Sequence, residues 1–270
     1  MNNLSKKALN IFIGFAILIA IWQTVILVTT INENLFPTPL MVWEAIISLI
    51  ADGTLFVHLQ ISLFRFATGY ILAVVIAIIL GLFLGRMERV WNIVDPIVQV
   101  LRPVAPIAWA PFIVLWFGIG NAPAIVIIFI AAFFPVLLST VSAVKKVDKT
   151  YLKVAENLEI KQPQLMMKII LPAAFPYIAN GLHIALGTAW IFLVSGGEMV
   201  GAQSGLGYLI VDARNLLRLD LVLAGIIFIG LCGLILDKLI MVFEKWIQKQ
   251  WGVAQPQQNK GRKIVPDTLC

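Results

Sequence analysis

The sequence predicts an all-α polytopic membrane protein with six transmembrane helices. Its 270 residues are 60% hydrophobic and only 13% charged, and the mean hydropathy is +0.96. Soluble domains carry about 25% charged residues. A helix needs about 17–25 apolar residues to cross the hydrocarbon core of a bilayer. Six runs meet this length, at 11–28, 59–85, 97–118, 122–144, 174–197 and 221–246.

The basic residues give the six crossings a direction. Most Lys and Arg residues lie before the first run, at 86 and 89, between 145 and 168, or after 237. Cytoplasmic segments of membrane proteins are rich in these residues. We therefore expect residues 1–10 and the polar tail 251–270 in the cytoplasm, the tail disordered, with the membrane domain at 11–250. The net charge of +6 then reflects topology and not nucleic-acid binding.

The N-terminal part predicts one span and one surface helix. The first run follows Lys6 and Lys7 but has no small-residue cleavage site after it, which indicates an uncleaved span and not a signal peptide. Residues 37–53 are amphipathic and contain a tryptophan suited to the headgroup region. Their apolar side consists of Trp43, Ile46, Ile47 and Ile50. We expect a helix that lies along the membrane interface.

The second run has a small residue at every fourth position. These residues are Gly69, Ala73, Ala77, Gly81 and Gly85. Such spacing places them on one helix face, and small residues let two helix backbones approach closely in lipid. We expect this face to pack against another helix, either in the same chain or in a second copy.

The third and fifth runs contain the candidate pathway. Three prolines within the segment LRPVAPIAWAPFIVLWFGIG free backbone carbonyls, which membranes tolerate only where protein buries them or a cavity solvates them. The fifth run ends in the glycine-rich segment SGGEMVGAQSGLGYLI, which predicts an irregular or hinge-like backbone. The candidate pathway residues are Arg102, Pro103, Pro106, Pro111, Ser195 and Glu198.

Ionisable residues in or beside the runs are few, and each has two interpretations. Charge in hydrocarbon is costly, so such residues are functional candidates. Arg65 can instead extend its side chain to the membrane surface. Arg102 can guide an anion or pair with a carboxylate, and Glu198 can bind solute or serve as a structural partner. We expect Asp237 to mark the inner end of the last span and His183 to pack in the core.

The sequence lacks the patterns of an enzyme. It contains no G-x-x-x-x-G-K-[ST] phosphate loop, no H-E-x-x-H and no G-x-S-x-G. His58 and His183 are its only histidines, and Cys232 and Cys270 its only cysteines, so neither a metal site nor a disulfide framework is expected. We expect no catalytic residues, metal or cofactor in this chain.

The charged loop at 145–172 is the most informative stretch. Residues 151–158 place apolar side chains at helical spacing, and Gln162-Pro163 predicts the end of that first helix. A second short helix should follow. The apolar residues of the first are Tyr151, Val154, Ala155 and Leu158, and those of the second are Leu165, Met166, Ile169 and Ile170. A solvated loop needs no apolar stripe, so we expect a soluble partner to cover it.

This loop resembles a motif in the membrane subunits of ATP-binding-cassette (ABC) importers, which reads E-A-A, three residues, G, nine residues, I-x-L-P. Four residues match, Ala155, Ile169, Leu171 and Pro172, whereas Lys153, Val154 and Glu159 stand where the family has Glu, Ala and Gly. In that family the loop docks into an ATPase subunit. The implied coupling residues are Tyr151, Lys153, Val154, Ala155, Leu158, Glu159, Ile169, Leu171 and Pro172.

Two longer segments, LRPVAPIAWAPFIVLWFGIG and GEMVGAQSGLGYLIVDARNLL, resemble permeases of the nitrate/sulfonate/taurine family of ABC importers. The resemblance implies the type I, methionine-transporter-like permease fold in the plasma (inner) membrane. It also implies a homodimer, an ATPase dimer that binds ATP and Mg, and an extracytoplasmic substrate-binding protein. The implied solute is a small anion, alkanesulfonate or taurine before nitrate. The alternative is an ion-coupled secondary carrier or channel that needs no ATPase.

Overall fold

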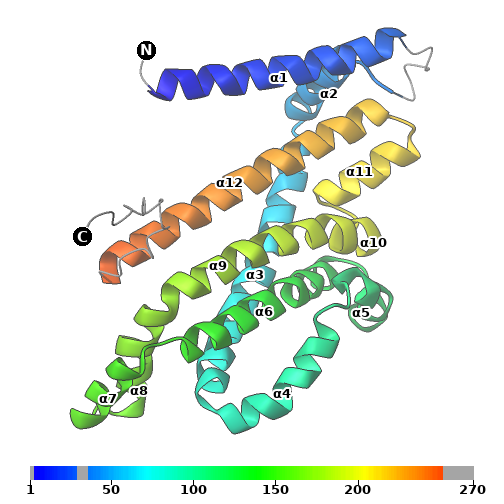
Figure 1. Cartoon of the computed structure of the whole chain (residues 1–270). Coiled ribbons are helices and arrows are strands. Elements are labelled where there is room, and N and C mark those ends of the chain that lie inside the picture. The colour runs from blue at the N-terminus through cyan, green and yellow to red at the C-terminus, as the bar shows by residue number, and fades with distance from the viewer. Residues whose placement is uncertain (1–2, 29–35, 252–270) are drawn as a thin grey trace.

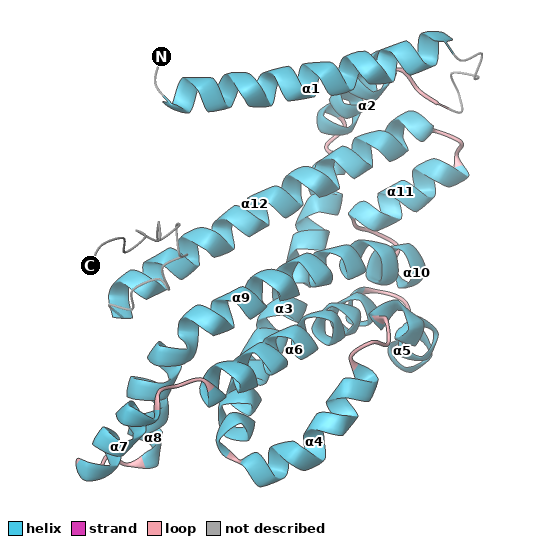
Figure 2. Cartoon of the chain, in the orientation of Figure 1, coloured by secondary structure: helices cyan, strands magenta, loops and turns pink. Residues whose placement is uncertain are grey.

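The computed structural model describes residues 3–28 and 36–251, and within them every regular element is helical (Figures 1 and 2). The predicted tail lies outside these residues from 252 onward. The elements are α1 (Asn3–Val28), α2 (Pro39–Ala51), α3 (Thr54–Arg86), α4 (Glu88–Leu101), η1 (Pro106–Trp109), α5 (Ala110–Phe117), α6 (Asn121–Lys145), α7 (Lys149–Asn157), α8 (Gln162–Leu165), η2 (Met166–Ile170), α9 (Leu171–Phe192), η3 (Leu193–Glu198), α10 (Met199–Gly201), α11 (Leu206–Asn215) and α12 (Leu219–Trp251).

Helices α3, α6 and α9 form the centre of the molecule (Figure 1). The small-residue face of α3 lies against α6 of the same chain. A Cβ atom added to Gly69 would lie 2.8 Å from Ile128 Cβ, and one added to Gly81 would lie 2.6 Å from Thr140 Cβ. The two backbones therefore approach more closely than any larger side chain would permit.

Helices α3 and α6 run parallel. Their contacts advance together along both helices, because Gly69 faces Ile128 and Gly85 faces Val144. Two parallel spans require the chain to return across the membrane between them. The segment 87–120 makes this return as α4, then η1 and α5, with an 85° bend between Leu101 and Pro106. The predicted third span is thus a broken crossing, as its prolines require.

Helices α9 and α12 complete an antiparallel arrangement. Ser139 Oγ donates a hydrogen bond of 2.8 Å to Tyr177 O, while Gly197 of η3, which continues α9, faces Ala124, so α9 runs opposite to α6. The rings of Phe175 and Trp251 lie 5.1 Å apart, which brings the last residue of α12 to the first turns of α9. The C-terminal end of α12 therefore lies at the same end of the bundle as α7 and α8.

The number of spans agrees only in part with the prediction. Within the described part of the chain, four helices or continuous helical segments are long and apolar enough to cross a membrane, and the bent α4–α5 pair is a fifth. The predicted first span falls in α1, whose apolar described part, Ile13–Val28, is shorter than the other spans. Six spans are thus not fully confirmed.

The amphipathic helix predicted at 37–53 is α2, which is shorter, from Pro39 to Ala51. It packs on α3 and α12 through Val42, Ala45 and Leu49, which are buried. Trp43 on its predicted apolar side is exposed, as are Ile47 and Ile50. These side chains suit contact with lipid.

Gly81→Ala should lower the thermal stability of the permease. The added Cβ would overlap Thr140, and overpacking of this kind costs about 1–3 kcal/mol. Gly230→Ala is the control, because nothing lies within 4 Å of a Cβ at that helical position. Alanine is otherwise the better helix former, so the control should be neutral or slightly stabilising. Unfolding midpoints in detergent test this, and equal midpoints for the two variants would refute the packing described here.

Candidate functional site

Helix α7 begins at a side-chain cap. Asp148 Oδ1 accepts 2.8 Å hydrogen bonds from the backbone N–H and from the hydroxyl of Thr150. These hydrogen bonds, the backbone one foremost, lower the pKa of Asp148 below its usual value. A lowered carboxylate pKa means that the cap stabilises α7 above the pKa of the unfolded chain and loses this effect only as the pH falls through the folded value. The cap is therefore intact at neutral pH.

Helix α7 ends earlier than predicted, at Asn157 and not at Gln162. The backbone turns at Glu159, whose φ is +50°, in the left-handed region. Ile160 N–H donates to Ala155 O, and Glu159 N–H donates to Glu156 O, at 3.0 and 2.9 Å. This is the Schellman pattern of helix termination, in which glycine usually occupies the left-handed position. Glu159 occupies it here.

Replacing Glu159 with glycine should stabilise the α7–α8 segment. A non-glycine residue in the left-handed region costs about 1 kcal/mol, which glycine avoids. The exposed Asn157 is a suitable control, since Asn157→Gly lies in the helix and should destabilise it. Limited proteolysis of the loop should show slower cleavage for Glu159→Gly and faster cleavage for Asn157→Gly. Cleavage of both variants at the wild-type rate or faster would contradict the geometry.

The α7–α8 segment has its own buried core. Ala155 is only 2% exposed and lies in a cluster with residues of α3, α6, α8 and η2. The other buried members are Leu82, Val144, Leu165 and Ile170. The sequence grouped Ala155 with its exposed neighbours, but the structure turns it inward. Ala155 therefore holds the segment against the bundle and is not part of its outer face.

The outer face of this segment is apolar. Tyr151 and Val154 of α7 are exposed, as is Leu158 directly after it, by 67%, and Met167 of η2 is exposed as well. We call these four residues the docking patch. Lys153 and Glu159 are also exposed, whereas Ile169, Leu171 and Pro172 are half-buried where η2 enters α9. An apolar patch on a water-exposed helix indicates a surface that a partner covers.

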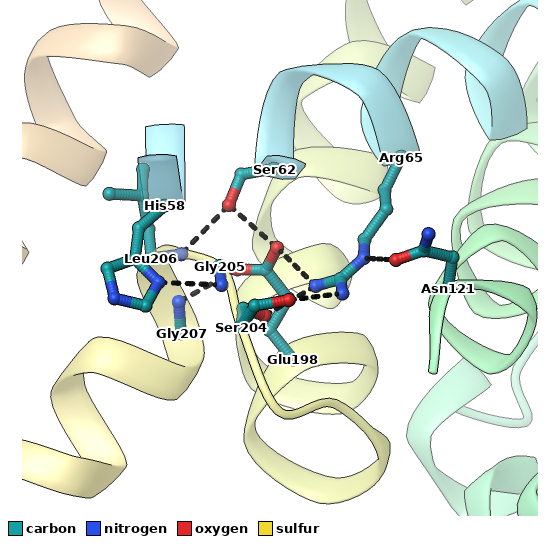
Figure 3. A network of polar contacts seen from close by, with 9 residues as sticks. All are labelled: His58, Ser62, Arg65, Asn121, Glu198, Ser204, Gly205, Leu206 and Gly207. Carbon is teal, nitrogen blue, oxygen red and sulfur yellow. Dashed lines mark hydrogen bonds and ion pairs between the residues drawn. The ribbon is translucent and has the colours of Figure 1, made fainter. Parts of the chain in front are cut away.

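A buried polar network lies at the opposite end of the bundle (Figure 3). Arg65 of α3 is 1% exposed and Glu198 of η3 is 0% exposed, and their Nη1 and Oε1 atoms lie 3.1 Å apart. Arg65 Nε donates to Asn121 Oδ1 at 2.8 Å. Its Nη1 also donates to the carbonyl oxygen of Ser204 at 2.6 Å, and its Nη2 donates to the Ser204 hydroxyl oxygen at 3.0 Å. The guanidinium is therefore neutralised and held by several acceptors.

The same network fixes the glycine-rich segment 204–207. Glu198 Oε2 accepts a hydrogen bond of 2.8 Å from Gly207 N–H, and Oε1 accepts one of 2.6 Å from Ser62. Ser62 in turn accepts from Leu206 N–H at 2.8 Å. Gly205 has a φ of +110°, and a Cβ there would collide with the Glu198 carboxylate. Only glycine suits this position.

The network changes the assignment of two residues. Arg65 does not extend to the membrane surface, because its side chain is buried and paired. Glu198, expected on the pathway, lies inside the protein, where its carboxylate joins α3 to the segment 204–207. The sequence contained one signal for this ion pair, because both residues are charged, with opposite sign, and lie in or beside apolar runs. The contact itself could not be predicted, because the two residues are 133 positions apart in the sequence.

The other predicted pathway residues occupy different environments. Arg102 and Pro103 are exposed at the bend that follows α4, and Pro111 is exposed at the start of α5. Pro106 is buried. The half-buried Ser195 donates its hydroxyl hydrogen to Ile191 O at 2.8 Å. Arg102 and Pro103, which are adjacent in the sequence, thus share one exposed surface at the bend.

His183 joins α9 to α12. Its Nε2 lies 2.7 Å from Glu244 Oε2, and its Nδ1 lies 3.3 Å from Asp237 Oδ1. Asp237 was expected only to mark the end of a span, so this contact is a correction. Glu244 is buried and was not identified from the sequence.

Comparison with known proteins identifies the family of this chain. Residues 73–249 match the family model of the binding-protein-dependent transport system inner membrane component. The chain is 38% identical over 234 residues to SsuC of Bacillus subtilis (strain 168), named as an aliphatic sulfonates transport permease protein. The alignment covers 87% of this chain and 84% of SsuC.

Two further relatives have similar coverage. The taurine transport system permease protein TauC of Escherichia coli (strain K12) is 34% identical, over 89% of each chain. The nitrate import permease protein NrtB of Synechocystis sp. (strain ATCC 27184 / PCC 6803 / Kazusa) is 32% identical, over 90% of each chain.

A solved structure has the same fold. It belongs to the MetNI methionine ABC transporter in an inward-facing conformation, and the match has a TM-score of 0.54 at 17% identity. It covers 78% of this chain and 94% of that one. The fold is therefore that of a type I ABC importer permease. The chain belongs to the family of inner membrane components of binding-protein-dependent transport systems, and it is a multi-pass permease subunit of an ABC importer, not an enzyme.

Proposed function

We propose that this permease carries a small anion across the membrane and is driven by a separate ATPase subunit that binds the docking patch. The observation that carries the proposal is the patch itself. Tyr151, Val154 and Leu158 are spaced for one helix face, and they remain exposed although the same short helix has a buried core. An apolar helix face of this kind fits a groove on a protein partner.

The connections of the α7–α8 segment suit the transmission of movement. Helix α8 continues through η2 into α9 without a loop. The buried cluster beneath α7 includes Leu82 of α3 and Val144 of α6. A displacement of α7 would therefore move α3, α6 and α9 together. Closure of the ATPase dimer on ATP would supply this displacement, and the result would be alternating access.

The remaining partners follow from the same proposal. The α7–α8 end of the bundle would face the cytoplasm, together with the C-terminal end of α12. A second copy of this permease would complete the passage, and an extracytoplasmic binding protein would deliver solute to the opposite end. The N-terminus is also proposed to be cytoplasmic, as the distribution of basic residues favours.

The names of the relatives support an anionic solute. SsuC, TauC and NrtB are named for aliphatic sulfonates, taurine and nitrate, respectively. We infer an alkanesulfonate or taurine first, because SsuC has the highest identity of the three, and nitrate second. All three solute types carry a negatively charged oxyanion group.

The test uses the complete transporter. The permease, the ATPase subunit and the binding protein of the same transport system are produced together, and purification through a tag on the permease should recover the ATPase. After reconstitution, ATP hydrolysis is measured with binding protein and a panel of sulfonates, nitrate and a neutral pyrimidine. Stimulation by a sulfonate is expected. Failure to recover an ATPase would contradict the coupling, and stimulation by the pyrimidine alone would contradict the choice of solute.

A further inference from the structure

Five polar residues on or directly after α4 lie on one face of that helix, whereas Arg89, in its first turn, lies outside this face. The five are Glu88, Asn92, Asp95, Gln99 and Arg102, at alternating intervals of three and four residues. At 3.6 residues per turn this spacing confines them to about 80° of the helix circumference. Ile93, Ile97 and Val100 point in other directions. We call the five polar residues the polar track.

The described residues outside α4 leave this track largely uncovered. Helix α4 buries only Trp91 and Val98, whereas Asn92, Gln99 and Arg102 are exposed. Gln99 Nε2 donates a hydrogen bond of 3.3 Å to Asp95 Oδ1, within the track. Arg102 makes no hydrogen bond or ion pair with any residue in the described ranges. Its charge is therefore available, unlike that of Arg65, which Glu198 neutralises.

The position of α4 makes an exposed polar face significant. Since α3 and α6 are parallel, the segment 87–120 must cross the membrane, and α4 is the first half of that crossing. Arg102 follows 14 helical residues, so it lies about 21 Å along the helix from Glu88. Polar and charged groups at such depth face protein or a water-filled cavity, and not lipid.

We propose that the polar track of α4 lines the solute passage, and that Arg102 contacts the acidic group of the solute there. This proposal rests on the proposed function, in which the solute is a small anion. The arrangement of charge supports the role of Arg102. Arg102 is the one basic residue of the track and lies at the bend, whereas Glu88 and Asp95 lie nearer the α7–α8 end, Glu88 beside Arg86 and Arg89. A planar guanidinium suits the oxygens of a sulfonate, carboxylate or nitrate group.

Cysteine accessibility tests the location of the track without a transport assay. In a background with Cys232→Ser and Cys270→Ser, single cysteines are placed at Asn92 and Gln99, with Ile93 and Ile97 as controls on the same helix. The assembled complex in vesicles is treated with membrane-impermeant methanethiosulfonates. Asn92→Cys and Gln99→Cys should react, and Ile93→Cys and Ile97→Cys should not. Equal reactivity at all four positions, or no reaction at Asn92→Cys and Gln99→Cys, would overturn the proposal.

The charge of the reagent tests Arg102 itself. An anionic sulfonate reagent should modify Gln99→Cys faster than a cationic trimethylammonium reagent does. Adding Arg102→Gln should lower this rate ratio about tenfold, as expected for one charge at about 6 Å in water. Arg102→Lys should largely preserve the ratio. A ratio that Arg102→Gln leaves unchanged would refute the role of Arg102. Because labelling requires no ATP hydrolysis, such a failure is distinct from a failure of ATPase coupling.

Discussion

Leu158→Lys should release the ATPase subunit while leaving the permease folded. The side chain is 67% exposed and supports none of the permease core, so the substitution would remove only the proposed contact with the partner. Burial of a leucine is worth about 1.5–3 kcal/mol, and affinity for the ATPase should therefore fall about ten- to hundredfold. Co-purification and ATP-dependent uptake should both be lost, with an unchanged unfolding midpoint for the permease.

The neighbouring substitution Ala155→Asp should also abolish uptake, but for another reason. Ala155 is buried among Leu82, Val144, Leu165 and Ile170, where an unpaired carboxylate is strongly unfavourable. This variant should lose the ATPase together with the folded α7–α8 segment, so that proteolysis of the loop is faster. Leu158→Lys should leave the proteolysis rate unchanged. The two variants thus separate docking from local folding.

A control for Leu158→Lys lies at the other end of the bundle. Leu216, in the turn between α11 and α12, is similarly exposed at 64%, and Leu216→Lys should leave ATPase binding intact. If Leu158→Lys also retains the ATPase at wild-type affinity, the docking patch is not the coupling surface.

Glu198→Gln should be among the most destabilising single substitutions in this chain. It leaves the buried Arg65 charge without its counter-ion, and loss of one partner from a buried pair costs about 3–5 kcal/mol. The segment 204–207 should also loosen, because Gly207 N–H donates to the same carboxylate. Unfolding midpoints in detergent, with hydrogen exchange at residues 204–207, measure both effects.

Two further variants distinguish the loss of the buried ion pair from the loss of a charge in general. Arg218→Gln removes an ion pair with Asp220 in which Arg218 is 54% exposed, and such pairs contribute about 0–1 kcal/mol. The double variant Arg65→Gln/Glu198→Gln should be less destabilised than the sum of its single variants, since no uncompensated charge remains. If Glu198→Gln lowers the unfolding midpoint as little as Arg218→Gln does, the buried network contributes little to the stability of the permease.

Local patterns predicted much of the fold. The apolar runs that became α3, α6, α9 and α12 are long enough for periodicity and length to identify them without tertiary information. The prolines after Arg102 correctly predicted a break in the third run, because a regular helix cannot satisfy their neighbouring carbonyls. Gln162-Pro163 predicted two short helices, although the left-handed turn at Glu159 ends the first one sooner.

The candidate sites depend on contacts between helices, and the spacing of residues along the sequence does not predict these contacts. Ala155 and Val154 are adjacent in sequence, but Ala155 faces the bundle and Val154 faces outward, a distinction set by where α3 and α6 lie. The pairing of Arg65 with Glu198 joins residues on helices that no local pattern brings together. The polar track has a local signature, but the parallel arrangement of α3 and α6 is what places α4 in a membrane crossing.

Solute uptake by the reconstituted protein tests the central claim most directly. Vesicles that contain the permease alone, or the permease with its ATPase subunit, are supplied with ATP on the ATPase side and with binding protein and labelled sulfonate on the other side. Uptake is predicted only in vesicles that contain the ATPase, and it should stop in those made with Leu158→Lys. Uptake by the permease alone, driven by an ion gradient and unaffected by Leu158→Lys, would contradict the account.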